Sequence, residues 1–321
     1  MPPKSSIKSR LFDTARLLVV AGKGGVGKTT VTAALAIAAA DSGHRVLVVT
    51  IDGRPGLARL LGAPDGAGST YEGDTVVSGR GPGKRGSVHL RTISAAEALQ
   101  DYLGTQGLAR LAKRLVSTGV VDVVASAAPG IDDLLVLGKI KHLVGLAGAD
   151  GPHDLVIVDG PAAGHALSLL RSPQAMAETV RGGPLRSQAI EIRNMMSDPE
   201  KCRLVLVTLP ETTPVNELLE TSALLTNEIG VALGPVVVNG VDHADDVEAL
   251  VAAGGLAEGE LADAARYRAS RCAVHRREVA RIDATSAEGH LELPYLTTGA
   301  VDHKAVRTLA HALLDQIEGA S

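Results

Sequence analysis

A glycine-rich segment with two lysines carries the clearest chemistry in this sequence. Residues 22–30 match the phosphate-loop pattern G-x-x-x-x-G-K-[ST]. Glycines let successive backbone N–H groups turn towards phosphate oxygens, and the following helix adds partial positive charge at its N-terminus. The segment therefore predicts a site for ATP and Mg²⁺, with these nucleotide-binding residues: Gly22, Lys23, Gly24, Gly25, Val26, Gly27, Lys28, Thr29 and Thr30.

Each polar side chain of this loop has an expected role. Lys28 neutralises the β- and γ-phosphates, Thr29 offers a hydroxyl to Mg²⁺, and Thr30 is placed to bond the α-phosphate. Lys23 is an additional lysine, and holding it near another cation is costly unless phosphate charge compensates. The alternative, a glycine-rich turn that binds nothing, does not explain both lysines.

The surrounding elements alternate between strands and helices. An apolar run at 17–21 precedes the loop, and the alanine-rich segment 30–42 predicts a helix. The predicted fold is α/β, a P-loop NTPase with a mostly parallel twisted sheet, helices on both faces and a small helical cap. Further buried strands are expected at 45–51, 155–158, 204–208, 235–238 and about 291–293.

A peripheral hairpin is expected between residues 74 and 93. Its connection, SGRGPGKRG, is interpreted as a solvated turn, with a phosphate or lipid patch as the alternative. Helical spacing dominates from 95 to 148, with a break at Pro129 and Gly130.

Two aspartates follow buried strands. Asp52 and Asp159 each end an apolar run, where a carboxylate is poorly tolerated unless a cation or a donor meets it. We expect both to serve Mg²⁺, and Asp52 also to act in catalysis. The alternative for each is a helix cap or a turn carboxylate.

Composition limits the domain organisation and the location of the protein. The chain has 321 residues and a net charge of −4, which gives no general attraction to nucleic acid or acidic membranes. We expect a flexible tail at 1–15 and one ATPase domain at 16–321, with cap elements at about 95–150 and 166–200. Cys202 and Cys272 form no CxxC pair, and the sequence has no signal peptide or long apolar run, so a cytoplasmic location without stable membrane insertion is expected.

The pattern x-K-G-G-x-x-K-[ST] resembles the deviant Walker A loop of the MinD, ParA, nitrogenase iron protein and ArsA superfamily. The resemblance implies that Lys23 reaches the nucleotide of a facing subunit and stabilises transition-state charge, as an arginine finger does. Lys23 is therefore a second expected catalytic residue.

Two further motifs resemble the ArsA branch, which includes the arsenite-pump ATPase and the ATPases that target tail-anchored proteins. DGPAAGHALSLLR, from Asp159, is similar to DTAPTGH, and PGIDD, from Pro129, is similar to PGIDE. The resemblance implies switch roles for Gly164 and His165 and a water-orienting role for Asp52. It implies nucleotide-base contacts for these residues: Asn239, Pro294 and Leu296.

The sequence also departs from this family. TIDGRP at 50–55 stands where members usually read TDPAH, so the first switch loop is remodelled. Without CxxC or grouped cysteines, structural zinc and an arsenite-binding site are not expected. The segment 172–201 is interpreted as an ordinary surface helix pair, with a reduced client-binding groove as the alternative.

The leading hypothesis is a Mg²⁺-dependent dimeric ATPase of the ArsA-like family that couples its nucleotide state to a protein partner or cargo. Its dimer forms with itself or with a paralogue. One alternative is a weakly hydrolysing or inert subunit of a heterodimer. A second is a positioning ATPase like MinD or ParA, although the 306–317 stripe lacks the cationic face that membrane binding needs.

Overall fold

The computed structural model describes most of the chain. The described residues are 11–51, 53, 56–78, 86–105, 130–148, 150–243, 247, 249, 259–297 and 300–319. The strands are β1 (Leu17–Gly22), β2 (Arg45–Ile51), β3 (Asp74–Ser78), β4 (Ser87–Ile93), β5 (Leu155–Ala162), β6 (Cys202–Thr208), β7 (Val236–Val241) and β8 (His290–Pro294). The helices are α2 (Leu11–Thr14), α3 (Lys28–Asp41), α4 (Leu57–Leu60), α5 (Ala95–Thr105), α8 (Ile131–Gly145), α9 (Ala163–Thr179), α10 (Pro184–Ser197), α11 (Thr212–Leu224), the π-helical turn η1 (Leu225–Ile229), α13 (Glu260–Thr285) and α14 (His303–Glu318).

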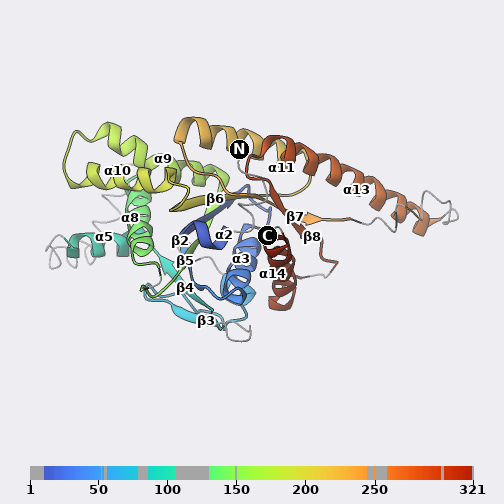
Figure 1. Cartoon of the computed structure of the whole chain (residues 1–321), viewed down its shortest axis with the longest axis horizontal. Coiled ribbons are helices and arrows are strands. Elements are labelled where there is room, and N and C mark those ends of the chain that lie inside the picture. Colours follow the sequence, from blue (N-terminus) through green and yellow to red (C-terminus); the bar gives the residue numbers. More distant parts are fainter. Residues whose placement is uncertain are drawn as a thin grey trace.

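One sheet organises the molecule and confirms the predicted α/β class (Figure 1). Its strand order is β3-β4-β2-β5-β1-β6-β7-β8. Every pairing is parallel except that of β3 with β4. Because neighbouring strands are parallel, the loops after β1, β2, β5, β6 and β7 meet at one edge of the sheet, where a ligand site is expected.

Each face of the sheet carries its own apolar core. Side chains of β1 alternate between the two: Leu18 and Val20 pack on the side of α3 and α14, whereas Leu17 and Val19 face α8, α9 and α11. This alternation follows from the two-residue period of a strand, and burial on both faces explains the unbroken apolar run at 17–21. The predicted helices on both faces are therefore present.

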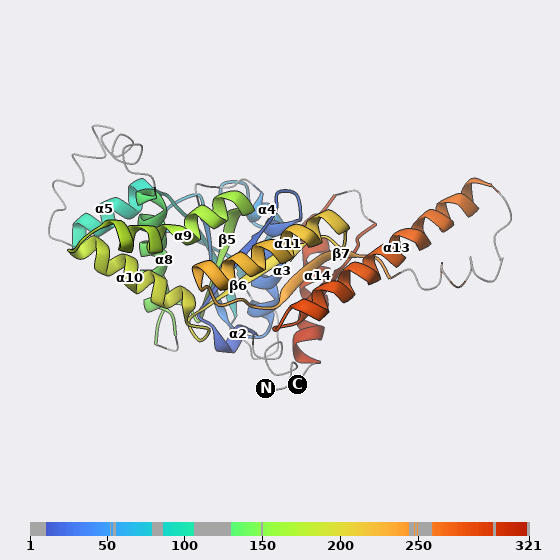
Figure 2. The same cartoon turned by 90° about the horizontal axis from the view of Figure 1, so that it is seen from above.

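Helices α5, α8, α9 and α10 gather at one end of the molecule, and the first half of α13 extends away from the other end (Figure 2). The cap helices cover the ranges in which helical cap elements were expected, apart from residues 106–129, which lie outside the described residues. Within the described residues, no helix combines the length and the apolar character that crossing a bilayer requires.

Two details differ from expectation. The expected tail reached residue 15, but α2 places Leu11 and Phe12 in the core, so packed structure begins by residue 11. The expected peripheral hairpin does form between β3 and β4, yet β4 also pairs with β2 and so belongs to the main sheet. Val88 and Leu90, at the second and fourth positions of β4, are buried, which lets β4 pair with the buried strand β2.

Candidate functional site

The phosphate loop connects the fully buried strand β1 to helix α3. Two of its glycines are fixed by close approaches. A Cβ on Gly22 would lie 2.4 Å from the carbonyl oxygen of Val207 in β6, and one on Gly27 would lie 2.3 Å from Nδ2 of Asn239. Gly27 also has a φ of 90°, which side chains rarely adopt, so glycine is required at both positions for the loop to fit between β6 and β7.

Lys28 begins α3 and lies inside the loop. Its side chain is only 6% exposed, and Nζ donates to the carbonyl oxygen of Lys23 at 2.8 Å. The ammonium is therefore directed across the concave side of the loop, where a phosphate would add opposite charge.

The structure brings Asp159 and Thr29 together, although they are far apart in sequence. Asp159 is 0% exposed in β5, in register with Val20 of β1 and Thr50 of β2. The Thr29 hydroxyl donates to Asp159 Oδ2 at 3.0 Å. An aspartate and a threonine hydroxyl at the start of the phosphate-loop helix are the ligands or water-holding groups of a Mg²⁺ site in this type of fold.

Thr32 is a member of this cluster that the sequence analysis missed. Its hydroxyl donates to Asp159 Oδ1 at 3.2 Å, so the two threonines hold both carboxylate oxygens. The spacing of the two threonines could have identified Thr32 from the sequence. Residues three apart share one face of a helix, so Thr32 faces β5 as Thr29 does. A buried carboxylate whose two oxygens are both oriented by hydroxyl donors fits a metal cation, and Thr29 with Asp159 are the residues that would hold Mg²⁺.

The residues expected to contact the nucleotide base lie at the ends of β7 and β8. Asn239 of β7 donates from Nδ2 to the carbonyl oxygen of Val26 at 2.9 Å, so in this structure it braces the phosphate loop. Pro294 ends β8 in register with Val241, and Leu296 packs against the core on the α3 side of the sheet. The adjacent Tyr295 is half-exposed beneath the Arg271 guanidinium, whose carbon lies 4.5 Å from the ring centroid.

The loop after β7 is held by a buried carboxylate. Asp242 accepts two hydrogen bonds from Arg268, both at 2.9 Å, and one from Arg271 at 2.7 Å. The hydrogen bonds from Arg268, and with them those from Arg271, keep the pKa of Asp242 well below its ordinary value despite burial. Helix α13 thereby fixes the chain segment that follows Asn239.

The predicted switch residues are only partly described. Gly164 and His165 lie exposed in the first turn of α9, and Gly164 lines a pocket together with Lys23. Asp52 lies outside the described residues, as do Arg54 and Pro55. The preceding Thr50 is paired with Thr92 of β4 through their hydroxyls, which are 3.0 Å apart. The roles of these switch residues, like those of every site residue, stay predictions.

The two cysteines take no part in this site. Cys202 and Cys272 are free and buried, and burial raises the pKa of Cys202 to about 12. Across the described part of the chain, no three His, Cys, Asp or Glu side chains are grouped so that they could hold a metal ion.

Comparison with known proteins places this geometry in a family. Residues 15–182 match the model of the anion-transporting ATPase family, a range that includes the phosphate loop, Asp159 and the switch segment but ends before Asn239 and Pro294. The family fold is that of a P-loop NTPase, as the sheet and loop described above require.

Individual relatives agree with the family match. The ATPase BagA of Mycobacterium tuberculosis is 33% identical over 229 residues, covering 70% of this chain and 64% of that protein. A putative arsenical pump-driving ATPase of Halobacterium salinarum is 28% identical, over 71% of this chain and 36% of that protein. The ATPase GET3B of Arabidopsis thaliana is 23% identical, over 69% of this chain and 63% of that protein.

The match thus spans slightly less than two thirds of the mycobacterial relative, at 64% of its length. It extends over more of this chain than the family model does, since the model covers residues 15–182 alone. From the phosphate loop, the parallel sheet and these matches together, the chain belongs to the anion-transporting ATPase family, the ArsA-like branch to which the sequence motifs pointed.

Proposed function

We propose that this protein is a Mg²⁺-dependent ATPase that works as a nucleotide-driven dimeric switch. The observation that carries the proposal is the buried Asp159, whose two oxygens are held by Thr29 and Thr32 at the start of the phosphate-loop helix. A buried carboxylate is stabilised by a cation, and Mg²⁺ with bound phosphates supplies one at this position. Membership of an ATPase family agrees with this reading.

Each part of the site has a task in this proposal. The loop amides and Lys28 bind and orient the phosphates, and Thr29 and Asp159 hold the metal, which neutralises charge as the terminal phosphate departs. Asp52 orients the attacking water, and Gly164 with His165 report the presence of the γ-phosphate. Asn239 and the loop at Pro294 and Leu296 contact the base.

Lys23 is the residue that supports a dimer. Its side chain is half-exposed, whereas Lys28 is buried, so Lys23 is accessible to a facing subunit. In the proposed cycle ATP closes two subunits, either identical or paralogous, around Lys23, and hydrolysis lets them open. A protein partner or cargo reads this change through the cap helices, in the cytoplasm.

The protein class named for some relatives does not transfer to this chain. The Halobacterium relative is a putative arsenical pump-driving ATPase, whereas both cysteines here are buried, and burial opposes thiolate formation at Cys202. A membrane-positioning ATPase is also disfavoured, because the apolar stripe of α14 packs into the core with α3 instead of facing outward.

One other function has an observation in its favour. The remodelled loop TIDGRP at 50–55 favours a subunit that binds nucleotide but hydrolyses it slowly, and that depends on a paralogous partner. Both functions use the same nucleotide pocket, so they differ in turnover and not in binding.

The test measures binding and turnover on the same purified protein. Calorimetry with Mg·ATP and Mg·ADP comes first, followed by phosphate release from the chain alone and with the paralogue from an adjacent gene, and light scattering in each nucleotide. We expect binding, turnover by the chain alone and dimerisation with ATP, all abolished in Lys28→Met and retained in Lys201→Met, which alters an exposed lysine paired with Asp198.

The outcomes separate the alternatives. Binding with turnover only in the presence of the paralogue supports the slow subunit. Association that never changes with nucleotide removes the dimeric switch. The absence of any binding by folded protein at millimolar nucleotide overturns the whole proposal.

A further inference from the structure

The outer lysine of the phosphate loop is already engaged within its own chain. Lys23 Nζ donates to Oε1 of Glu217 in α11, a residue 194 positions away in the sequence. The two side chains are 49% and 39% exposed, respectively. A lysine that must contact phosphate therefore begins from an ion pair with a carboxylate of the same subunit.

The two oxygens of the Glu217 carboxylate differ in their hydrogen bonding. Its Oε2 atom is buried and accepts no hydrogen bond from the residues that the structure describes, whereas Oε1 accepts from Lys23. Both residues line a cavity of about 310 Å³ beside the loop, whose wall also includes Gly24 and Gly164. With Lys23 withdrawn, Glu217 would present an unpaired negative charge next to the phosphate loop, which disfavours a triphosphate there.

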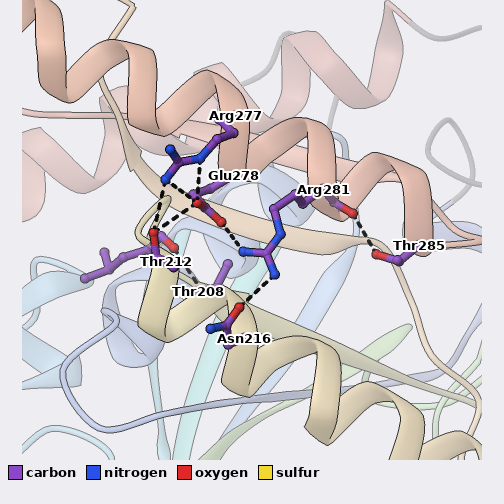
Figure 3. Close-up of polar contacts among 8 residues, drawn as sticks. Thr208, Thr212, Asn216, Arg277, Glu278, Arg281 and Thr285 are labelled. Carbon is purple, nitrogen blue, oxygen red and sulfur yellow. Dashed lines mark hydrogen bonds and ion pairs between the residues drawn. The ribbon is translucent and has the colours of Figure 1, made fainter.

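Side chains of α13 hold the start of α11 in a clasp (Figure 3). Glu278 of α13 is 1% exposed and accepts from Thr212 at 3.0 Å, from Arg277 at 2.9 Å and from Arg281. Arg281 also donates to Oδ1 of Asn216 at 2.7 Å, one residue before Glu217. Because both contacts fall in the first two turns of α11, that end of the helix is held in place and Glu217 points at the loop.

We propose that Glu217 is a positioning residue that retains Lys23 within its own subunit until a nucleoside triphosphate and a facing subunit compete for it. The inference rests on the proposed function, because it takes Lys23 to be a phosphate contact. An exposed ion pair is weak, so Glu217 biases Lys23 and does not block it. The size of that bias is about two- to fivefold in an equilibrium constant.

Lysine reactivity tests the retention without any nucleotide. The purified chain and its Glu217→Gln variant are labelled briefly with an amine-reactive ester, and mass spectrometry compares Lys23 with Lys201. We expect labelling of Lys23 to rise about two- to fivefold in the variant, with Lys201 unchanged. Equal labelling of Lys23 in the two proteins would overturn the proposal. Glu220→Gln is the matched control, because Glu220 lines the same cavity on α11, whereas the carboxylate that pairs with Lys23 is that of Glu217.

Affinity for a non-hydrolysable ATP analogue gives the second readout. Glu217→Gln is expected to bind Mg·analogue and to dimerise about two- to fivefold more tightly than the original chain at low salt, with a smaller gain at high salt because salt screens exposed charges. The gain must vanish when Lys23→Gln is also present. A gain of the same size in that background shows that Glu217 acts by general repulsion, and retention of Lys23 is then wrong.

Labelling and binding together separate a failure of Lys23 retention from a failure of the proposed function. If neither protein binds nucleotide while Lys23 labelling still rises in Glu217→Gln, the proposed function fails and the intrasubunit retention stands as a contact of the free chain. If both bind equally well and Lys23 labelling does not change, the retention fails and the proposed function is untouched.

Discussion

The two sides of the phosphate loop are built differently. On the inner side, towards α3 and β5, Lys28, Thr32 and Asp159 are buried and Thr29 is partly buried, and all four are hydrogen-bonded among themselves or to the loop. On the outer side, Lys23 and Glu217 meet in a half-exposed ion pair. Buried polar groups with fixed partners are held rigidly, whereas an exposed ion pair exchanges easily with water. One loop therefore combines a preformed binding side with a movable side.

The largest expected effect is on the inner side, at Asp159. Asp159→Asn should weaken Mg²⁺-dependent ATP binding by about 100-fold or more, because it removes a metal-holding carboxylate. Stability should change by no more than about 1 kcal/mol, since asparagine keeps polar partners for both threonines and removes a buried charge. Calorimetry with and without Mg²⁺, alongside urea unfolding, measures both. A variant that binds Mg·ATP normally would remove the metal site from Asp159.

The next effect tests the residue that the sequence analysis missed. Thr32→Val should lower Mg²⁺ affinity or turnover about tenfold, because Thr32 orients a carboxylate oxygen without touching the metal. Thr32→Ser keeps the hydroxyl and should behave like the original chain. The measurement is a Mg²⁺ titration of ATP turnover or binding. Equal losses in the valine and serine variants would point to packing in place of the hydrogen bond.

On the outer side, the clasp between α11 and α13 should stabilise the folded chain. Burial disfavours the charged form of Glu278, but hydrogen bonds from Arg277, Arg281 and Thr212 outweigh it and lower the pKa of Glu278. Glu278→Gln should cost about 1–2 kcal/mol in the free energy of unfolding at neutral pH. A lowered pKa stabilises the fold above the ordinary glutamate range, so the difference should shrink as acid protonates the carboxylate.

Urea unfolding of both proteins between pH 3 and pH 7 follows that difference. The matched control is Glu228→Gln, which breaks an exposed ion pair with Arg171 and should change stability by less than about 1 kcal/mol. A constant difference at every pH would show that the charge of Glu278 is not what stabilises the clasp.

The smallest effect lies at the opposite edge of the sheet. Burial, and then the nearby His89, lower the pKa of His153 to about 4. The unfolded chain takes up a proton near pH 6.5 while the folded chain does not, so this group makes folding less stable as pH falls from about 6.5 towards 4. Replacing His153 with Asn should reduce that loss by about 1 kcal/mol, since solvent screens a half-buried ring. Thermal unfolding of both proteins across this range checks it, with nucleotide affinity unchanged.

Much of the inner side could be predicted from the sequence. The phosphate loop is a local pattern, and a carboxylate ending a buried strand identifies Asp159 without long-range information. Parallel order then places both at one sheet edge, as the register of β1 with β5 shows. Thr32 was within reach, because it follows Thr29 by three residues.

The contact between Lys23 and Glu217 on the outer side could not be predicted from the sequence, for a physical reason. Glu217 and Lys23 are 194 positions apart, and their contact depends on how α11 packs over β6, which no local spacing encodes. The bracing of Val26 by Asn239 similarly joins residues separated by 213 positions. The tail boundary was wrong for another reason: four residues of α2 are too few to show a helical period, yet Leu11 and Phe12 suffice to anchor them.

The packing of α14 has a consequence for how the chain is made. Val306, Leu309 and Leu313 of α14 lie in the same core as α3, the helix that begins at the phosphate loop. A ribosome delivers residues from the N-terminus onward, and a unit of this kind folds once its parts are all present. The phosphate loop is therefore synthesised long before the helix that completes the packing around α3, and α3 lacks part of its core until α14 has been made.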